Sequence, residues 1–427
     1  MTSEFASSPH ARWLEGETDR LLGFARGAWL PDGGFGLLDE RGRVTDARTV
    51  DLLITCRMTH VFSIAHVLGR PGGGLLADHG LTSLRTLFAD RVNGGWYREV
   101  HLDSGLPADD RKDAYTHAFV LLAGSSAVQA QRPGARELLD AALCVVERHF
   151  WDEGEGRVRE SWDAAFGVDE PYRGANSNMH SVEAFLAAAD STGDPVWLTR
   201  ALRIADWLIN GVARANRWRI VEHFHADGSE DREYHAEDVA HQYRPYGATI
   251  GHALEWSRLL LHLRAGLGTS APGWLLEASA ALFETAVLEG WGVDGADGFI
   301  YTTNWSGVPV VRARLHWVLA EAIGAAAALG KATGDRRYAD LYQRFWDHAA
   351  VYFLDYEQGS WHHELDPTNR PSASVWSGKP DIYHALQTTL IPRLPLAPSL
   401  TAAVARGQLD AVPSTNPWSL HTTPRKP

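Results

Sequence analysis

Two kinds of hydrophobic pattern alternate along the chain. Segments of the first kind are apolar on almost every side and rich in Ala and Leu, as is typical of helices buried on most faces. Each of them carries a His near its start. They are RMTHVFSIAHVL (57–68), AYTHAFVLLAGSSAV (114–128), NSNMHSVEAFLAAAD (176–190), IGHALEWSRLLLHL (250–263), RLHWVLAEAIGAAAAL (314–329) and IYHALQTTLI (382–391).

The second kind has apolar residues every three or four positions and charges on the opposite face, which predicts helices that cover the first set. Between the two kinds lies a glycine-aromatic element, in which Gly or Asn precedes alternating aromatic and polar residues, as in a short hairpin. Clear covering helices are 135–150, 195–209, 274–290 and 337–353, and the hairpin elements are 32–38, 93–100, 155–163, 216–224, 297–305 and 358–365.

A unit of covering helix, hairpin and buried helix therefore repeats six times. Such a chain closes most simply into an all-α (α/α)6 barrel, with the buried helices as the inner wall. We expect one catalytic domain over 1–427, with an irregular tail from about 396 where Pro recurs. The hairpins should bring the six His to one end of the barrel, and a pocket at that mouth is the expected site.

Composition narrows the functional classes. The formal charge is −13 without a basic stripe, so we expect no nucleic-acid partner. No apolar run is long enough for a membrane helix, and the acidic N-terminus does not look like a signal peptide. Two cysteines, Cys56 and Cys144, cannot form a disulfide framework or a Cys-rich metal site. These features predict a cytoplasmic protein.

Chemistry at the mouth is expected to depend on His. The chain has 20 His and 17 Trp; imidazole suits proton transfer near neutral pH, and Trp stacks on flat apolar ligand faces. A single His at a helix start can be purely structural, and we interpret His117 and His316 in that way because they have few polar neighbours in sequence.

Two His have a carboxylate three residues later on the same helix face. They are His252 with Glu255 and His180 with Glu183. Glu255 could hold the tautomer of His252 and raise its basicity. A metal site at such pairs is the alternative, since His and Glu both ligate metals, but no HExxH motif or Cys ligand accompanies them. We therefore expect neither a metal nor another cofactor.

Two cations near these helices have open interpretations. Lys379 precedes Pro380 and His384 and could form a Schiff base, bind a phosphate or hydroxyl group, or be exposed. Arg57, three residues before His60, could bind sugar or enediolate oxygens or hold a loop by a salt bridge. Motifs for nucleophilic hydrolysis, nucleotide hydrolysis and nicotinamide binding do not occur. Two His in one pocket suit reversible proton transfer at a carbon beside a carbonyl.

The repeats as a set resemble the N-acylglucosamine 2-epimerase superfamily over about residues 10–395. The segments that carry the resemblance are NSNMHSVEAFLAAAD, GATIGHALEWSRLL and SGKPDIYHALQTTLIP. TCRMTHVFSIAH at 55–66 is similar to the aldose–ketose isomerase branch, because the epimerase branch typically has a Trp-containing motif after the Arg where this chain has Met-Thr-His.

The resemblance implies metal-free catalysis through a cis-enediol. His384 would move a proton between C1 and C2, while His252, supported by Glu255, would open the ring and protonate oxygen. The remaining residues that would line the sugar site are Arg57, Tyr115, Asn176, His180, Arg244, Trp317 and Trp376.

The expected reaction is the interconversion of free D-mannose and D-fructose, with D-lyxose and D-xylulose as a further pair, by a monomer or homodimer. Three alternatives remain. They are a 2-epimerase acting on cellobiose or an N-acylglucosamine, a sulfoquinovose isomerase, and a member of the superfamily that binds another protein without catalysis. A glycoside hydrolase would need two carboxylates across the pocket, where this chain has His.

Overall fold

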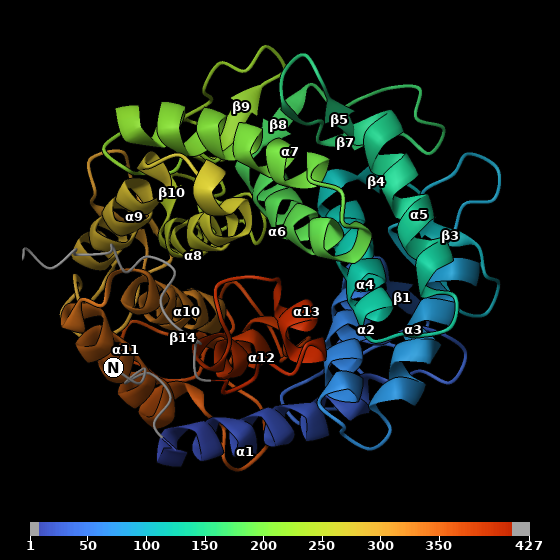
Figure 1. Ribbon diagram of the computed structural model, residues 1–427, viewed down its shortest axis with the longest axis horizontal. Coiled ribbons are helices and arrows are strands. Elements are labelled where there is room, and N and C mark those ends of the chain that lie inside the picture. The colour runs from blue at the N-terminus through green and yellow to red at the C-terminus, as the bar shows by residue number, and fades with distance from the viewer. Residues whose placement is uncertain (1–7, 412–427) are drawn as a thin grey trace, which may run out of the picture.

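The computed structural model describes residues 8–411, in which helices alternate between an inner and an outer ring (Figure 1). The inner helices are α2 (Leu52–Val67), α4 (Ala114–Gln129), α6 (Ala175–Thr192), α8 (Ile250–Leu267), α10 (His316–Thr333) and α12 (Tyr383–Leu390). The outer helices are α1 (Ser8–Ala25), α3 (Gly73–Thr86), α5 (Ala135–Val145), α7 (Val196–Ala205), α9 (Trp274–Gly290) and α11 (Arg336–His348).

The inner ring is closed. Each inner helix contacts the next one along the chain, and α12 returns to contact α2. Each of the first five inner helices packs against the outer helix that follows it, whereas α12 packs against α1, so the first helix completes the last pair. The predicted (α/α)6 barrel is confirmed.

Burial explains the two sequence patterns. Inner helix α10 is buried on every side along Ala325–Leu329, because it has neighbours on both flanks and an outer helix behind it. Outer helix α11 buries Tyr338, Tyr342, Phe345 and Trp346, which recur at helical spacing on one face. Two inner helices begin at side-chain caps: Asp51 accepts a hydrogen bond from the Ile54 N–H at α2, and Asp113 accepts one from the Thr116 N–H at α4.

Further helical turns extend or follow these elements. Turns of π-helix continue three outer helices, at η3 (Val146–Phe150), η4 (Asp206–Ala213) and η6 (Ala349–Phe353). Short 3₁₀ turns are η2 (Arg26–Ala28), η5 (Gly268–Ser270) and η7 (Ile391–Arg393).

Short strands precede the inner helices and link neighbouring repeats. The preceding strands are β1 (Thr49–Asp51), β4 (Lys112–Asp113), β8 (Tyr172–Gly174), β10 (Ala248–Thr249) and β13 (Arg314–Leu315). Each pairs antiparallel with a strand of the next repeat, namely β2 (Glu99–His101), β7 (Ser161–Trp162), β9 (His223–His225), β11 (Thr302–Thr303) and β14 (Glu364–Leu365). Strands β3 (Pro107–Asp109), β5 (Trp151–Asp152), β6 (Arg157–Val158) and β12 (Pro309–Val311) complete the hairpins.

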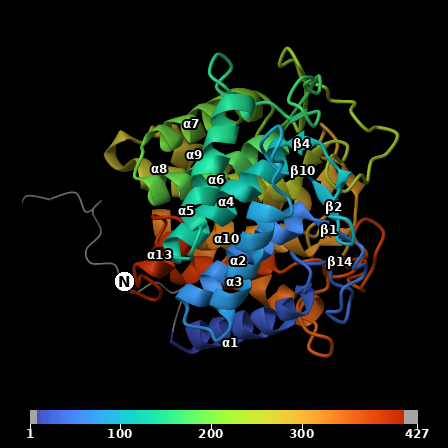
Figure 2. The same cartoon turned by 90° about the vertical axis from the view of Figure 1, so that its right-hand side faces the viewer.

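These strands and their loops gather at one end of the barrel, where the inner helices begin (Figure 2). In the register of β8 and β9, Gly174 lies opposite His223, so the start of α6 is held beside the residue that follows Glu222. The fold therefore brings loop side chains from one repeat over the helix start of another.

The prediction of an irregular tail from about residue 396 is partly wrong. Residues 400–405 form α13 (Leu400–Ala405), which packs on α2, α4 and α6 and buries Ala402 and Ala403. The small, apolar run LTAAVA suits a helix that covers the other end of the barrel. The rest of the predicted tail, 412–427, lies outside the described residues. A search of residues 8–411 finds no helix with the length and apolarity to cross a bilayer.

Candidate active site

A pocket of about 70 Å³ opens where the inner helices begin. Nine of the ten side chains expected in the site line it: Arg57, Tyr115, Asn176, His180, His252, Glu255, Trp317, Trp376 and His384. These residues come from all six inner helices or the segments just before them, so the barrel assembles a set that is scattered through the sequence.

A larger cavity of about 210 Å³ lies toward the opposite ends of the inner helices. Its walls are mostly apolar and include Leu186, Leu259 and the segment 396–401, together with His60 and His262. Within residues 8–411, none of the ten expected site residues lines this cavity. The smaller pocket is therefore the better candidate for chemistry, although it holds less volume.

His252 is held by a carboxylate from a neighbouring loop. Its Nδ1 lies 2.9 Å from Oε2 of Glu222, and both side chains are buried. The expected partner, Glu255, makes no hydrogen bond to His252, and neither of its oxygens has a hydrogen-bond partner among the described residues. The prediction that Glu255 supports His252 is thus wrong, because the imidazole turns toward the β8–β9 side of the barrel instead of along its own helix.

His384 has a similar arrangement. Its Nδ1 lies 3.0 Å from Oε1 of Glu321 on α10, and Oε2 of Glu321 accepts a hydrogen bond of 2.7 Å from Nε of Arg258. When each His is neutral, its Nδ1–H donates a hydrogen bond to the carboxylate, and the lone pair of Nε2 is left for another partner. The pocket therefore contains two imidazoles prepared to accept a proton.

Trp317 lies between these two imidazoles. Its ring centroid is 5.3 Å from that of His252 and 5.8 Å from that of His384. A Cβ at Gly251 would lie 2.2 Å from the Trp317 ring, so only glycine lets the indole lie against the start of α8. The indole therefore places an apolar surface between the two imidazoles.

Arg57 is fixed from both sides. It donates hydrogen bonds to Oδ2 of Asp381 at 2.9 Å and to the Tyr115 hydroxyl at 3.1 Å, and its guanidinium lies 4.7 Å from the centroid of the Phe119 ring. The structure shows the salt-bridge partner of Arg57 and places the residue in the pocket lining, while its contact with sugar oxygens stays a prediction. Burial raises the pKa of Tyr115 to about 12, which keeps its hydroxyl protonated at neutral pH.

A buried layer of charges lies beneath the pocket. Arg258 contacts Glu321 and lies 3.5 Å from Glu255. Burial would raise the pKa of Glu321, but the charges and hydrogen bonds of Arg258 and His384 together outweigh burial and lower that pKa to about 2. Burial, together with the negative charge of Glu321, holds the pKa of Glu255 well above its usual value. Glu255 thus favours its protonated form.

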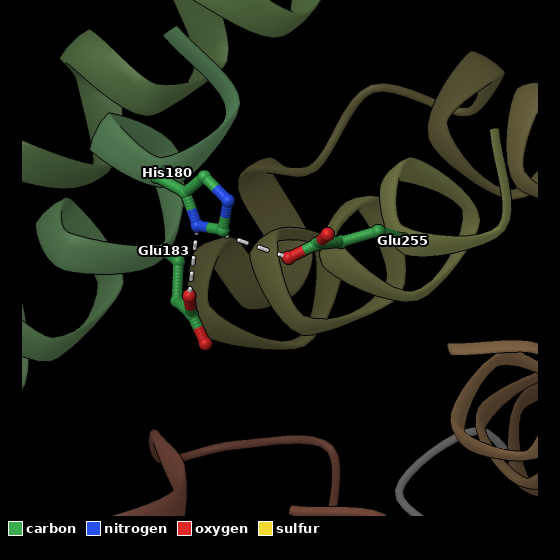
Figure 3. A group of neighbouring side chains, drawn as sticks. All are labelled: His180, Glu183 and Glu255. Carbon is green, nitrogen blue, oxygen red and sulfur yellow. Dashed lines mark ion pairs between the residues drawn. The ribbon is translucent and has the colours of Figure 1, made fainter. Parts of the chain in front are cut away.

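His180 points between two of these carboxyl groups (Figure 3). Its Nδ1 lies 3.6 Å from Glu183 on its own helix and 3.9 Å from Glu255 on α8. Burial lowers the pKa of His180 to about 4, so the ring is neutral at neutral pH. Glu183 also accepts a hydrogen bond from the Tyr383 hydroxyl and one of 3.1 Å from Gln387.

Two groups in this layer have ligand atoms close enough for a metal ion, His180–Glu183–Glu255 and Glu255–Glu321–His384. Both include Glu255, whose protonated form would have to lose its proton before it could ligate. The guanidinium of Arg258 already compensates the carboxylates of the layer. These carboxyl groups are therefore better matched by the guanidinium of Arg258 and the neighbouring imidazoles than by a divalent metal ion.

The structure places Arg244 outside the pocket lining, so its predicted place there is wrong. Its guanidinium pairs with Glu170 at 2.7 Å and lies over the Tyr172 ring at 4.1 Å. Its neighbour Tyr243 lines the pocket instead. Lys379 is also turned away: its buried Nζ donates hydrogen bonds to Asp355 at 2.6 Å and to the backbone carbonyl of Gly359 at 2.9 Å.

The six His do not all reach the mouth. His117 is structural as expected, since it bonds the Asp113 carbonyl and the Trp96 N–H. His60 lies further along its helix, contacts Ser126 and lines the larger cavity. His316, interpreted as structural from its sequence neighbours, lines the pocket.

Sequence reasoning also missed several side chains that line the pocket or support it. The lining residues it missed are Gln242, Tyr243, Tyr301, His363 and Asp381, and the supporting ones are Glu222 and Glu321. A signal was available for some of them, because Glu222, Tyr301 and His363 all lie in the glycine-aromatic hairpins.

The model of the N-acylglucosamine 2-epimerase (GlcNAc 2-epimerase) family matches residues 33–388. The chain belongs to this family. Within it, the chain is 56% identical over 407 residues to a D-mannose isomerase of Thermobifida fusca, covering 95% of this chain and 99% of the relative. It is 49% identical to a D-mannose isomerase of Pseudomonas cannabina pv. alisalensis, covering 95% and 97%.

A solved D-mannose isomerase structure matches with a TM-score of 0.84 at 28% identity, covering 91% of this chain and 98% of that one. The resemblance expected from the repeats is confirmed.

Proposed function

We propose that this protein is an aldose–ketose isomerase that interconverts D-mannose and D-fructose. The observation that carries the proposal is the pair of imidazoles, His252 and His384, each held by a buried carboxylate on either side of Trp317. Two relatives that match nearly the full chain bear the name D-mannose isomerase, which supports the same substrate. D-lyxose and D-xylulose are a further substrate pair, because D-lyxose has the same configuration at C2 and C3 as D-mannose.

In the proposed reaction, His252 first assists opening of the sugar ring. Nε2 of His384 then takes the proton from C2, the C2–H electron pair forms the C1=C2 bond, and the carbonyl electron pair moves to O1, which accepts a proton from protonated His252. The product of this step is a cis-enediol. Neutral His252 then takes the O2 proton, the O2–H electron pair forms the C2 carbonyl, and the electrons of the double bond take the proton back from His384 at C1. Atoms and charge balance without a redox partner.

Other lining residues have roles that follow from their chemistry. Arg57 and the Tyr115 hydroxyl would donate hydrogen bonds to sugar oxygens at which negative charge develops. Asn176 and His180 would bind hydroxyl groups, and Trp317 and Trp376 would pack against the sugar carbons. Protonated Glu255 would donate a hydrogen bond into the same pocket. Because Arg244 pairs with Glu170, we assign it no contact with substrate.

The pocket favours a neutral sugar over a sulfonated one. Among the described residues that line it, Arg57 is the only Arg or Lys, and its charge is already paired with Asp381. A sulfoquinovose isomerase would need a further cation for the sulfonate. We also propose that catalysis needs no metal, that the chain acts as one domain over 1–427, and that it works in the cytoplasm as a monomer or homodimer.

The decisive experiment incubates the purified protein with D-mannose, D-glucose, D-lyxose, cellobiose and N-acetyl-D-glucosamine in D2O. The expected result is D-fructose from D-mannose, with deuterium incorporated at C1 to the extent that His384 exchanges with solvent. Formation of a C2 epimer without ketose would identify a 2-epimerase. Failure to convert any sugar would favour a protein without catalytic activity.

A further inference from the structure

His316 is an unassigned side chain of the pocket with an unusual environment. It is the first residue of α10, is 6% exposed and lines the pocket next to Trp317. Its ring stacks on that of His363 with 3.7 Å between centroids and an interplanar angle of 24°. The ring of His384 lies 6.4 Å away and nearly perpendicular to it.

The contacts of His316 determine where its proton lies. Nδ1 lies 3.3 Å from the backbone oxygen of His363. A carbonyl oxygen can only accept a hydrogen bond, so Nδ1 must carry the hydrogen. Burial and the neighbouring His363 hold the pKa of His316 well below its usual value, so the ring is neutral and Nε2 has a free lone pair.

The stacked ring of His363 fixes this orientation. Its Nε2 lies 3.1 Å from the backbone oxygen of Asp381, to which it must donate. The backbone N–H of His316 donates to the His363 carbonyl as well, at 3.0 Å. His316 therefore cannot turn its ring without breaking the stack and the contact at Nδ1.

Nε2 of His316 is buried and has no hydrogen-bond partner among the described residues. Leaving such an acceptor without a donor costs free energy, and a bound hydroxyl group would satisfy it. We infer that Nε2 of His316 accepts a hydrogen bond from a hydroxyl group of the sugar bound beside His384. This inference rests on the proposed function, because it takes the ligand to be a sugar.

The role inferred here is that of a binding and specificity residue that accepts and never donates. Two other lining residues are donors: Arg57 donates to Asp381 and to the Tyr115 hydroxyl, and that hydroxyl keeps its own proton. An acceptor in the same pocket as these donors would fix the direction of one hydroxyl group. The site should accordingly discriminate against the sugar that lacks that hydroxyl.

The test compares His316→Phe, which keeps a ring to stack on His363, with His316→Gln, whose amide oxygen can reach the position of Nε2. Inhibition constants against D-mannose turnover are measured for 1,5-anhydro-D-mannitol, 2-deoxy-D-glucose and the 3-, 4- and 6-deoxy forms of D-mannose. For four of these analogues, His316→Phe should bind about three- to tenfold more weakly than the wild type, as expected for one lost neutral hydrogen bond. For the analogue without the relevant hydroxyl, both proteins should bind equally.

His316→Gln should recover part of the lost affinity for those four analogues. His348→Phe is the matched control, since His348 is buried with an unpartnered Nε2 but lies outside the pocket. This control should lower thermal stability about as much as His316→Phe does, and it should leave every inhibition constant unchanged.

Equal loss of affinity for all five analogues, or no loss for any, would overturn the inference while leaving the proposed function intact. Wild-type turnover of D-mannose to D-fructose, measured in the same assays, tests the proposed function separately.

Discussion

The carboxylate of Glu222 lies 2.9 Å from Nδ1 of His252, although the two residues come from different elements. Glu222 immediately precedes β9, whereas His252 is in the first turn of α8. Because the contact joins a loop to a helix start, the loop controls the orientation of an imidazole that would otherwise turn freely about its side-chain bonds. The same arrangement at Glu321 and His384 joins two inner helices.

Replacing Glu222 should change the pH dependence of catalysis. In Glu222→Gln the amide keeps a hydrogen bond but removes the negative charge that favours imidazolium. The acidic limb of kcat/KM should move to lower pH, and the plateau should fall about three- to tenfold because the hydrogen bond is weaker. pH–rate profiles measure both effects. Glu289→Gln, which changes a carboxylate paired with Arg219 away from the pocket, is the control; profiles of Glu222→Gln that overlay the wild type would argue against this role.

His384→Asn should remove nearly all turnover and leave the fold intact. General-base catalysis typically contributes about 10²–10⁴-fold, and here one group both takes and returns the proton. Asn can still donate to Glu321, so the buried layer keeps a partner. Steady-state kinetics and circular dichroism provide the measurements. Retention of more than a tenth of the wild-type rate would exclude His384 as the group that transfers the proton.

Glu255→Gln should stabilise the protein increasingly as pH rises. Burial raises the folded-state pKa of Glu255, so the folded state binds more protons than the unfolded state above about pH 4.5, and wild-type stability falls with pH in that window. The amide in Glu255→Gln cannot ionise, so the stability of this variant does not fall with pH for this reason. The difference in free energy of unfolding should grow by at most about 1.4 kcal/mol per pH unit until Glu255 ionises.

Urea unfolding of both proteins between pH 5 and 8 measures this difference. Glu277→Gln, at an exposed carboxylate paired with Arg214, should show no such trend. A constant difference between wild type and Glu255→Gln across the range would mean that Glu255 is ionised throughout.

Removal of divalent metals should leave turnover unchanged. Arg258 compensates the carboxylates that could otherwise bind an ion, and proton transfer by His needs no Lewis acid. Dialysis against EDTA followed by assays with and without added Mg²⁺, Mn²⁺ or Zn²⁺ tests this. Loss of activity with EDTA and recovery with one of these ions would contradict the proposed mechanism.

The barrel was predictable because its information is local and repeated. Each inner helix shows its burial in its own apolar pattern, and six copies make the assignment robust to errors at any one of them. The His at positions 252 and 384 could be found for the same reason, since they occupy equivalent helix starts.

The partners of these His could not be predicted from helical spacing. The rule that residues three apart share a face favours Glu255 for His252, but an inner helix has close neighbours on several sides that compete for its side chains. Glu222 lies just before β9, which pairs with β8, and from there it reaches His252, whereas Arg244 pairs with Glu170 outside the pocket lining. Both outcomes depend on tertiary geometry, which no local pattern encodes.

The pairing of α1 with α12 has a consequence for synthesis of the protein. A ribosome makes α1 first, but its partner α12, which carries His384, emerges only near the end of translation. Until then α1 exposes the apolar face that includes Leu14 and Leu21, and Thr18 lacks its contact with Thr389. A nascent chain with five complete pairs is therefore an open ring without its proposed proton-transfer base. Catalytic competence should appear abruptly at ring closure, not in proportion to the length of chain already folded.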